Sequence, residues 1–133
     1  MIGLVVATHS NLGRELLNAG EMIIGPLAQA AAVGIDPDIE VEEIRARIGA
    51  AIAQVDLAGQ GVIIMTDMFG GTPSNLSLTY LAPDKVEVLT GVNLPMLLKF
   101  FNSREALDLT TLATTLKNYG QQSISLASDF LRA

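Results

Sequence analysis

Residues 1–17 read MIGLVVATHSNLGRELL. The apolar run Ile2–Ala7 is short and continuous, which is typical of a strand that is buried on both faces in a parallel sheet. From Leu12 onwards apolar residues recur at helical spacing, and Gly25 and Pro26 end the pattern. A buried strand followed at once by an amphipathic helix predicts the first βα unit of an α/β fold.

The same alternation continues along the chain. Continuous apolar runs at Ala31–Ile35, Val62–Thr66 and Val86–Thr90 predict three more strands. Stripes of apolar residues at helical spacing predict further helices around Val41, Ile44, Ile48, Ile52 and Val55, around Leu94, Leu97, Leu98 and Phe101, and around Leu109, Leu112, Ala113 and Leu116. We therefore expect one α/β domain over residues 1–133, with three layers, a doubly wound sheet and right-handed crossovers. The segment 123–131 fits either a helix or a short alternating strand.

The composition excludes several kinds of chemistry. The chain has 133 residues, of which 50% are hydrophobic, with a formal net charge of -6, one histidine and no cysteine. Disulfides, thiolate nucleophiles, cysteine-ligated zinc and multi-histidine metal sites are excluded, and we expect no metal and no cofactor. An acidic chain without clustered lysine and arginine is not expected to bind nucleic acid. The N-terminus lacks the basic region of a signal peptide, and no apolar run is long enough to cross a bilayer, so we expect a cytoplasmic protein.

Polar residues follow three of the four predicted strands. Residues 8–11 (THSN) come after the first strand, residues 66–75 (TDMFGGTPSN) close and follow the third, and residues 91–95 (GVNLP) come after the fourth. In open α/β sheets, functional sites form outside the carboxyl ends of the strands. We therefore expect a site where these segments meet.

His9 is the main candidate for chemistry at that edge, because an imidazole exchanges protons near neutral pH and is a competent nucleophile. Asp67 directly follows the third strand. Its carboxylate could accept a hydrogen bond from one imidazole nitrogen and leave the other nitrogen free to attack. The alternatives are that His9 is a solvated loop residue and that Asp67 is a turn residue that binds nearby backbone N–H groups.

The segment Gly70, Gly71 and Thr72 is a candidate anion site. Two glycines let backbone N–H groups approach a ligand closely, and a helix that opens near Pro73 directs the positive end of its dipole there. The segment matches neither a Walker A loop nor a dinucleotide fingerprint, so a single phosphoryl group suits it better than a nucleotide. The alternative is an ordinary capped turn between a strand and a helix.

Several other residues have simpler predicted roles. Ser10 or Asn11 is expected to cap the helix that begins at Leu12. Arg14 and Arg104 are candidates for a basic patch on which a partner protein docks. The acidic residues between positions 36 and 43 are expected to form a solvated loop and helix start rather than a cation site. Four methionines are expected in the core: Met22, Met65, Met68 and Met96.

Together these segments resemble the enzyme IIA domain of the mannose family of the sugar phosphotransferase system. The matching residues are IGLVVATHSNLGRELL at 2–17, DMFGGTPSN at 67–75 and GVNLPML at 91–97. Their order and spacing cover essentially the whole chain, so the combination is far more specific than any single motif. The resemblance implies a doubly wound, mainly parallel sheet, for which we expect the strand order 2-1-3-4. It also implies a homodimer that exchanges an antiparallel edge strand, which we place in the segment from Ser123.

The resemblance further implies a role in phosphoryl transfer. His9 would accept a phosphoryl group from the phosphocarrier protein HPr and pass it to an enzyme IIB in sugar uptake. Asp67 would hold the Nδ1–H of the imidazole so that Nε2 is phosphorylated, and Gly70, Gly71 and Thr72 would bind the phosphoryl oxygens. Any association with the membrane components IIC and IID would be peripheral, through IIB.

The sequence leaves two other functions open. A free-standing enzyme IIA domain could be a regulatory phosphoprotein of an incomplete phosphotransferase system, because the same chemistry at His9 serves both roles. Alternatively, Asp67 could be the phosphoacceptor, as in receiver domains of similar architecture. We rank this last function lower, because a receiver should show an acidic pair after its first strand, which here ends in Ala7, Thr8 and His9.

Overall fold

The computed structural model describes residues 1–131, and its centre is a sheet of four parallel strands in the order β2-β1-β3-β4. The strands are β1 (Gly3–His9), β2 (Ala30–Ile35), β3 (Val62–Thr66) and β4 (Val86–Thr90). Because β1 lies between β2 and β3, Val5 is opposite both Ala31 and Ile64. The predicted strand order 2-1-3-4 is confirmed, and β1 continues two residues beyond its apolar run, to His9.

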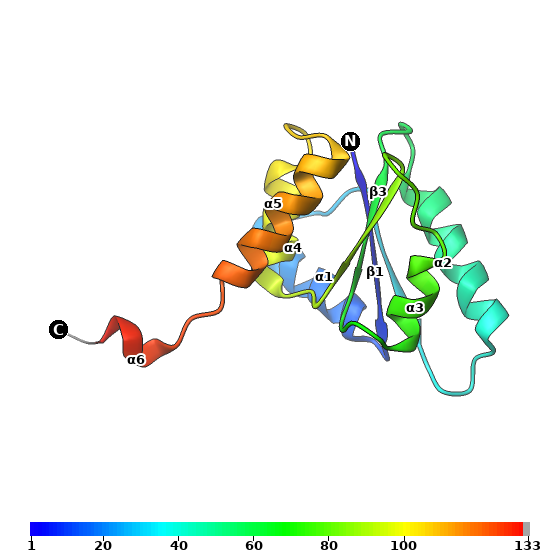
Figure 1. Cartoon of the computed structure of the whole chain (residues 1–133), viewed down its shortest axis with the longest axis horizontal. Helices are drawn as coiled ribbons and strands as arrows, with labels where there is room; N and C mark the ends of the chain where they lie inside the picture. Colours follow the sequence, from blue (N-terminus) through cyan, green and yellow to red (C-terminus); the bar gives the residue numbers. More distant parts are fainter. Residues whose placement is uncertain (132–133) are drawn as a thin grey trace.

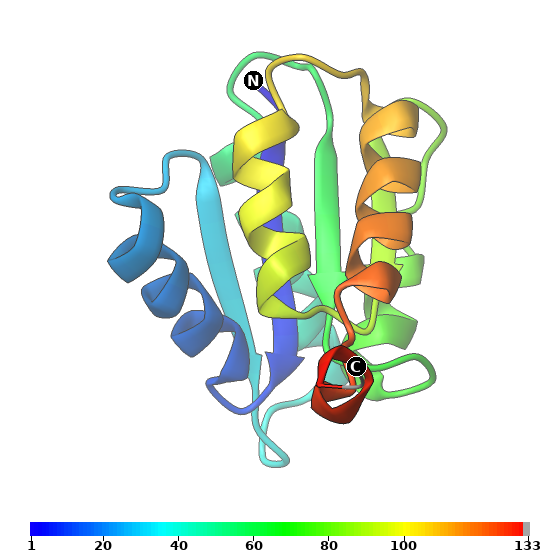
Figure 2. The same cartoon turned by 90° about the vertical axis from the view of Figure 1, so that its left-hand side faces the viewer.

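Helices cover both faces of the sheet (Figures 1 and 2). One face carries α1 (Leu12–Ile24), α4 (Leu94–Ser103) and α5 (Leu109–Gln122), and the other carries α2 (Val41–Val55) and α3 (Thr72–Leu78). Side chains of β1 alternate between two cores, so that Leu4 packs beneath α1, α4 and α5 while Val5 packs beneath α2 and α3. The three predicted layers are therefore confirmed. Because helices bury both faces of the sheet, its central strands are apolar at successive positions, which is the pattern that predicted the layers.

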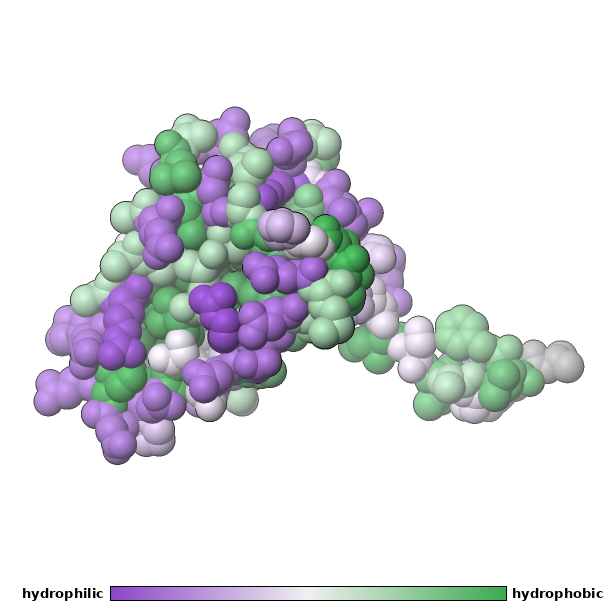
Figure 3. Space-filling view, turned by 180° about the vertical axis from the view of Figure 1, so that it is seen from behind, coloured by the Kyte–Doolittle hydropathy of each residue, from purple (hydrophilic) through white to green (hydrophobic). Residues whose placement is uncertain are grey.

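The segment after α5 leaves the body of the fold. It contains a four-residue helix, α6 (Ala127–Phe130), and Figure 1 shows it projecting away from the other elements. Figure 3 shows the same segment as a largely apolar outgrowth. Only part of the segment 123–131 is thus helical, and the exchanged strand stays a prediction. The large apolar side chains exposed there, at 65% to 84%, are Ile124, Leu126, Phe130 and Leu131.

Two of the four methionines that we expected in the core lie on the surface. Met65 and Met96 are buried, but Met22 is 88% exposed and Met68 is 55% exposed. Met22 lies in the last turn of α1, and Met68 lies in the loop after β3. The prediction is wrong for these two residues because apolar periodicity determines burial poorly where an element ends.

The N-terminus of α1 is capped by a residue of the preceding strand. Asn11 precedes the helix but makes no capping hydrogen bond with its side chain. Instead, Oγ1 of the buried Thr8 accepts a hydrogen bond from the backbone N–H of Gly13 at 2.8 Å. Asn11 thus occupies the N-cap position, as predicted, but the side-chain hydrogen bond to the first turn is made by Thr8. The bond ties the first turn of α1 to the strand residue that precedes His9.

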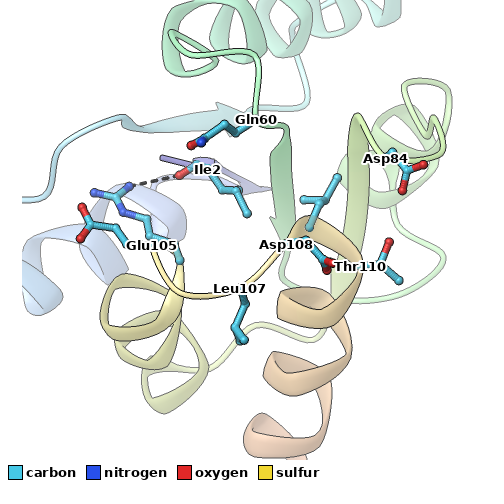
Figure 4. Close-up of a pocket in the computed structure, with 9 residues that line it drawn as sticks. Ile2, Gln60, Asp84, Glu105, Leu107, Asp108 and Thr110 are labelled. Atoms are coloured by element: carbon cyan, nitrogen blue, oxygen red, sulfur yellow. Dashed lines mark hydrogen bonds between the residues drawn. The ribbon is translucent and has the colours of Figure 1, made fainter.

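Arg104 lies at the edge of the sheet opposite to His9. It is only 7% exposed, and its guanidinium donates hydrogen bonds to the carbonyl oxygens of Ala28 at 2.8 Å and Ile2 at 3.4 Å. Figure 4 shows the bond to Ile2 beside a cavity of about 400 Å³ at the amino ends of the strands. The expectation that Arg104 belongs to a docking patch is wrong, because its guanidinium is buried. Its hydrogen bonds connect the end of α4 to the residues just before β1 and β2.

We expect Arg104→Met to destabilise the fold. The substitution removes the donor to the Ile2 and Ala28 carbonyls and the guanidinium that lies 5.4 Å and 4.9 Å from the ring centroids of Phe100 and Phe101. A loss of about 2 kcal/mol in the free energy of unfolding is expected, measured by urea denaturation. Arg14→Met, on the exposed side of α1, is the matched control. Equal stability of the two variants would contradict this role.

Candidate functional site

His9 ends β1, and its side chain is 52% exposed at the carboxyl edge of the sheet. The chain turns sharply at the next residue, because Ser10 has a φ of 51° and its N–H donates to the carbonyl of Ile35 at the end of β2. Since β1 lies between β2 and β3, the connections on its two sides run in opposite directions. Such a switch point is where open α/β sheets bind ligands.

Asp67 lies beside His9 because the strands that lead to them are neighbours. Thr66, the last residue of β3, is opposite Ala7 in the register. Asp67 Oδ2 lies 2.8 Å from His9 Nδ1 and accepts a hydrogen bond from the backbone N–H of His9 at 3.0 Å. A carboxylate only accepts, so Nδ1 carries the proton and donates it. In the neutral imidazole, Nε2 therefore keeps a free lone pair.

Asp67 also stabilises its own turn. Its Oδ1 accepts a hydrogen bond from the backbone N–H of Met68 at 3.1 Å, so the carboxylate contacts the imidazole and its own turn at the same time. Burial raises the pKa of the Asp67 carboxyl, but hydrogen bonds from the ring and backbone of His9 and the charge of His9 outweigh it, and the pKa lies below its ordinary value. Asp67 is consequently ionised at neutral pH.

The loop from Gly70 to Thr72 passes beside the imidazole. Gly70 lies in the turn before α3, and its φ of 86° is a left-handed value that favours glycine. Gly71 is so close to the ring that a Cβ there would lie 2.9 Å from His9 Cε1 and 3.5 Å from His9 Nε2. Thr72 is exposed, begins α3 and lines a cavity together with His9. Of the three predicted loop residues, Gly71 thus lies at the imidazole, and Thr72 lines the cavity that His9 also borders.

Two polar residues that we did not single out hold these segments in place. Thr8 fixes the end of β1 through its bond to Gly13. Asn75 Nδ2 donates to the carbonyl of Gly70 at 3.4 Å, across the loop that carries Gly71. Each of these bonds joins two residues that are five positions apart in the chain. The only sign of such a bond in the sequence is a hydroxyl or amide side chain close to a tight turn.

Within residues 1–131, no three histidine, aspartate or glutamate side chains converge where they could hold a metal ion. No helix among those residues is long and apolar enough to cross a membrane.

The fold and the site together define a class of protein. It is a doubly wound α/β domain whose switch point presents a half-exposed imidazole that a neighbouring carboxylate orients. Such an imidazole is suited to accepting and passing on a chemical group.

Comparison with known proteins identifies the family within this class. The family model described as "PTS system fructose IIA component", where PTS is the phosphotransferase system, matches residues 3–117. The chain is 30% identical to the fructose-specific EIIA component of Bacillus subtilis over 132 residues. This alignment covers 98% of this chain and 90% of the relative. It is also 30% identical over 105 residues to the mannose-specific EIIAB component of Escherichia coli K12, covering 78% of this chain but only 32% of that longer relative. The chain belongs to the mannose-type family of EIIA components of the sugar phosphotransferase system, as the resemblance predicted.

Solved structures share the fold. The EIIA component of Streptococcus agalactiae superimposes with a TM-score of 0.86 at 24% identity, covering 97% of this chain and 99% of that one. A PTS IIA protein associated with the fucose utilization operon of Streptococcus pneumoniae has a TM-score of 0.84 at 26% identity, covering 98% and 96%. The α/β architecture and its strand order are therefore those of EIIA structures.

Proposed function

We propose that this chain is a phospho-histidine carrier, which accepts a phosphoryl group from HPr on His9 and passes it to an enzyme IIB in sugar uptake. The contact of His9 Nδ1 with Asp67 Oδ2 carries the proposal, because it holds the ring in one tautomer with Nε2 available. The half-exposed side chain is also accessible to another protein. Membership in the EIIA family supports the same role.

The transfer is an in-line exchange between two imidazoles. The lone pair of His9 Nε2 attacks the phosphorus of the phosphorylated donor histidine, and the P–N bond to the donor breaks as the new P–N bond forms. The Nδ1 proton stays on His9, where the negative charge of Asp67 balances the imidazolium. Phospho-His9 then acts as the donor to IIB in the same way.

The loop of Gly70, Gly71 and Thr72 holds the phosphoryl oxygens in this mechanism. The N–H groups in the first turn of a helix have no partner within the helix, and α3 begins at Thr72. The closeness of Gly71 to the Nε2 edge of His9 supports the assignment. Backbone donors aimed at the equatorial oxygens would stabilise the charge of the transferring group.

We expect Gly71→Ala to lower the rate of His9 phosphorylation by about a hundredfold, because the added methyl group displaces the imidazole from the transfer path. The φ of Gly71 is -84°, which any residue adopts, so the backbone is not strained and the fold should keep its stability. Single-turnover transfer from phosphorylated HPr measures the rate, and thermal unfolding provides the control. A wild-type rate would show that Gly71 does not position the ring.

The proposal includes the assembly and location of the chain. We propose that residues 1–133 are one domain of a cytoplasmic homodimer, and that the segment 123–131 supplies the exchanged edge strand. The exposed apolar side chains of that segment support this, because contact with a second copy would remove them from water. The membrane components IIC and IID are reached through IIB. Sedimentation of the full chain as a monomer would contradict the dimer.

Labelling with phosphoenolpyruvate, enzyme I and HPr tests the function. We expect one labelled site that is labile in acid and stable in base, as a P–N bond is, and that loses its label when IIB is added. A label that IIB cannot remove would favour the regulatory alternative. A base-labile label would indicate an acyl phosphate on Asp67, and the absence of label would overturn the proposal.

A further inference from the structure

The loop that follows β3 runs between two buried hydroxyl groups. Thr66 ends β3 directly before Asp67, and Ser74 is the third residue of α3. Both side chains are 0% exposed. In the described part of the chain, theirs are the buried hydroxyl oxygens that have no hydrogen-bond partner, so the two do not bond to each other either. The loop between them carries Asp67 and Gly71, which both lie close to the ring of His9.

The two hydroxyls belong to the same layer of the fold. Side chains along a strand alternate between the faces of the sheet, so Thr66 faces the same side as Ile64, which packs beneath α2 and α3. Ser74 is on the buried side of α3 together with Leu76, which packs in that same core. The helix α3 packs on β1 and β3 near the ends of these strands (Figure 1). Both hydroxyls therefore lie in the layer between the sheet and α3.

Other buried hydroxyls near the site are paired within the protein. The hydroxyl oxygen of Thr8 accepts a hydrogen bond from the backbone N–H of Gly13 at 2.8 Å. The hydroxyl of Ser77, in the same helix α3, donates to the carbonyl of Pro73 at 2.6 Å. Burying a hydroxyl without a hydrogen bond is costly, so nearly all buried hydroxyls in folded proteins are paired with protein atoms or with internal water. The two hydroxyls beside the loop therefore need a partner from outside the described part of the chain.

We propose that Thr66 and Ser74 bind an internal water molecule, which joins the end of β3 to α3 and holds the loop between them in place. Water fits because it donates and accepts as a hydroxyl does, and because side chains that are 0% exposed leave no access for a larger solute. The bridge connects the two ends of the loop and thereby sets how closely Asp67 and Gly71 approach His9. Its effect on phosphoryl transfer rests on the proposed function, whereas the water itself does not.

Removing each hydroxyl tests the water through the sign of the effect on Tm. Thr66→Val keeps the shape of the side chain, and Ser74→Ala removes only the hydroxyl. If a hydroxyl has no partner, its replacement by an apolar group leaves Tm unchanged or raises it, whereas loss of one partner of a bound water lowers Tm. We expect each variant to lower Tm by about 4 °C, and the double variant to lower it by less than the sum. A crystal structure of the full chain should show the water in the wild type and not in the double variant.

The rate of transfer from phosphorylated HPr, measured over a range of HPr concentrations, tests the positioning role. We expect Thr66→Val and Ser74→Ala to lower kcat about tenfold and to leave KM unchanged, because the loop shifts at the imidazole while the exposed surface stays the same. Thr66→Ser keeps a hydroxyl and should retain most of the wild-type kcat. Ser77→Ala is the matched control, since its buried hydroxyl bonds within α3, and it should keep the wild-type kcat.

Each part of the inference can fail separately. An unchanged or raised Tm in both single variants would overturn the water, and a wild-type kcat in both would overturn the positioning role. Neither result would affect the assignment of His9 as the phosphorylated residue. A wild-type chain that takes no label would instead overturn the proposed function, and the Tm series and the crystal structure would still decide whether the water is bound.

Discussion

His9→Gln abolishes phosphorylation of the chain in the labelling reaction, which is the largest effect we expect. His9 is the only histidine among 133 residues, so no other side chain can form a phospho-histidine. Glutamine keeps much of the size of the ring and can still donate to Asp67, but its amide nitrogen has no lone pair for attack on phosphorus. The loss is therefore one of chemistry and not of structure.

The measurement is the amount of acid-labile, base-stable label after incubation with phosphoenolpyruvate, enzyme I and HPr. Because His9 is half-exposed, the substitution should change the free energy of unfolding by less than about 1 kcal/mol. Asn118→Ala, at an exposed position of α5, controls for handling and should label like the wild type. Persistent label of the same stability in His9→Gln would disprove the assignment.

Asp67→Asn lowers the rate of transfer to His9 by about 10²-fold to 10⁴-fold, the second largest effect we expect. An amide can turn its NH₂ group toward Nδ1, which moves the ring proton to Nε2 and blocks the attacking nitrogen. Even with its oxygen toward the ring, a neutral amide does not balance the imidazolium that forms on phosphorylation. The single-turnover rate from phosphorylated HPr measures the loss. Asp84→Asn, exposed at the amino end of the sheet, is the matched control.

The lowered pKa of Asp67 gives the same substitution a signature in stability. A carboxyl whose pKa falls below the ordinary value of 3.8 on folding stabilises the native state above that pH. The contribution disappears as the pH drops through the lower, folded-state pKa. The difference in free energy of unfolding between wild type and Asp67→Asn should therefore be present at neutral pH and shrink below pH 3.8. Urea unfolding at a series of pH values checks this, and a difference that grows in acid would contradict it.

The strands and the layers were accessible from local pattern. The strands β1 and β3 are apolar at nearly every position because helices cover both of their faces, and this continuous pattern is visible without any tertiary information. His9 and Asp67 could be paired in advance for a similar reason. Parallel strands end at the same edge of a sheet, so polar residues directly after two of them are brought to one place.

Residues at the ends of elements could not be placed in this way. Arg104 looked like a surface cation, yet it is buried at the end of α4, since only the assembled fold shows that two carbonyl groups need a donor there. Asn11 is the N-cap residue of α1, but Thr8 makes the side-chain hydrogen bond to its first turn, because the sharp turn at Ser10 brings the strand residue to the N–H of Gly13.

The sequence by itself determined the fold class and the two residues most suited to chemistry, since both follow from periodicity and motif order, and its resemblance to the family implied the strand order. Only the tertiary structure decided that one carboxylate oxygen of Asp67 accepts hydrogen bonds from both the ring and the backbone N–H of His9. It also decided that Gly71 lies close to the same ring. These contacts join residues about 60 positions apart in the chain. They depend on strand register and loop conformation to within an ångström, which hydrophobic pattern does not encode.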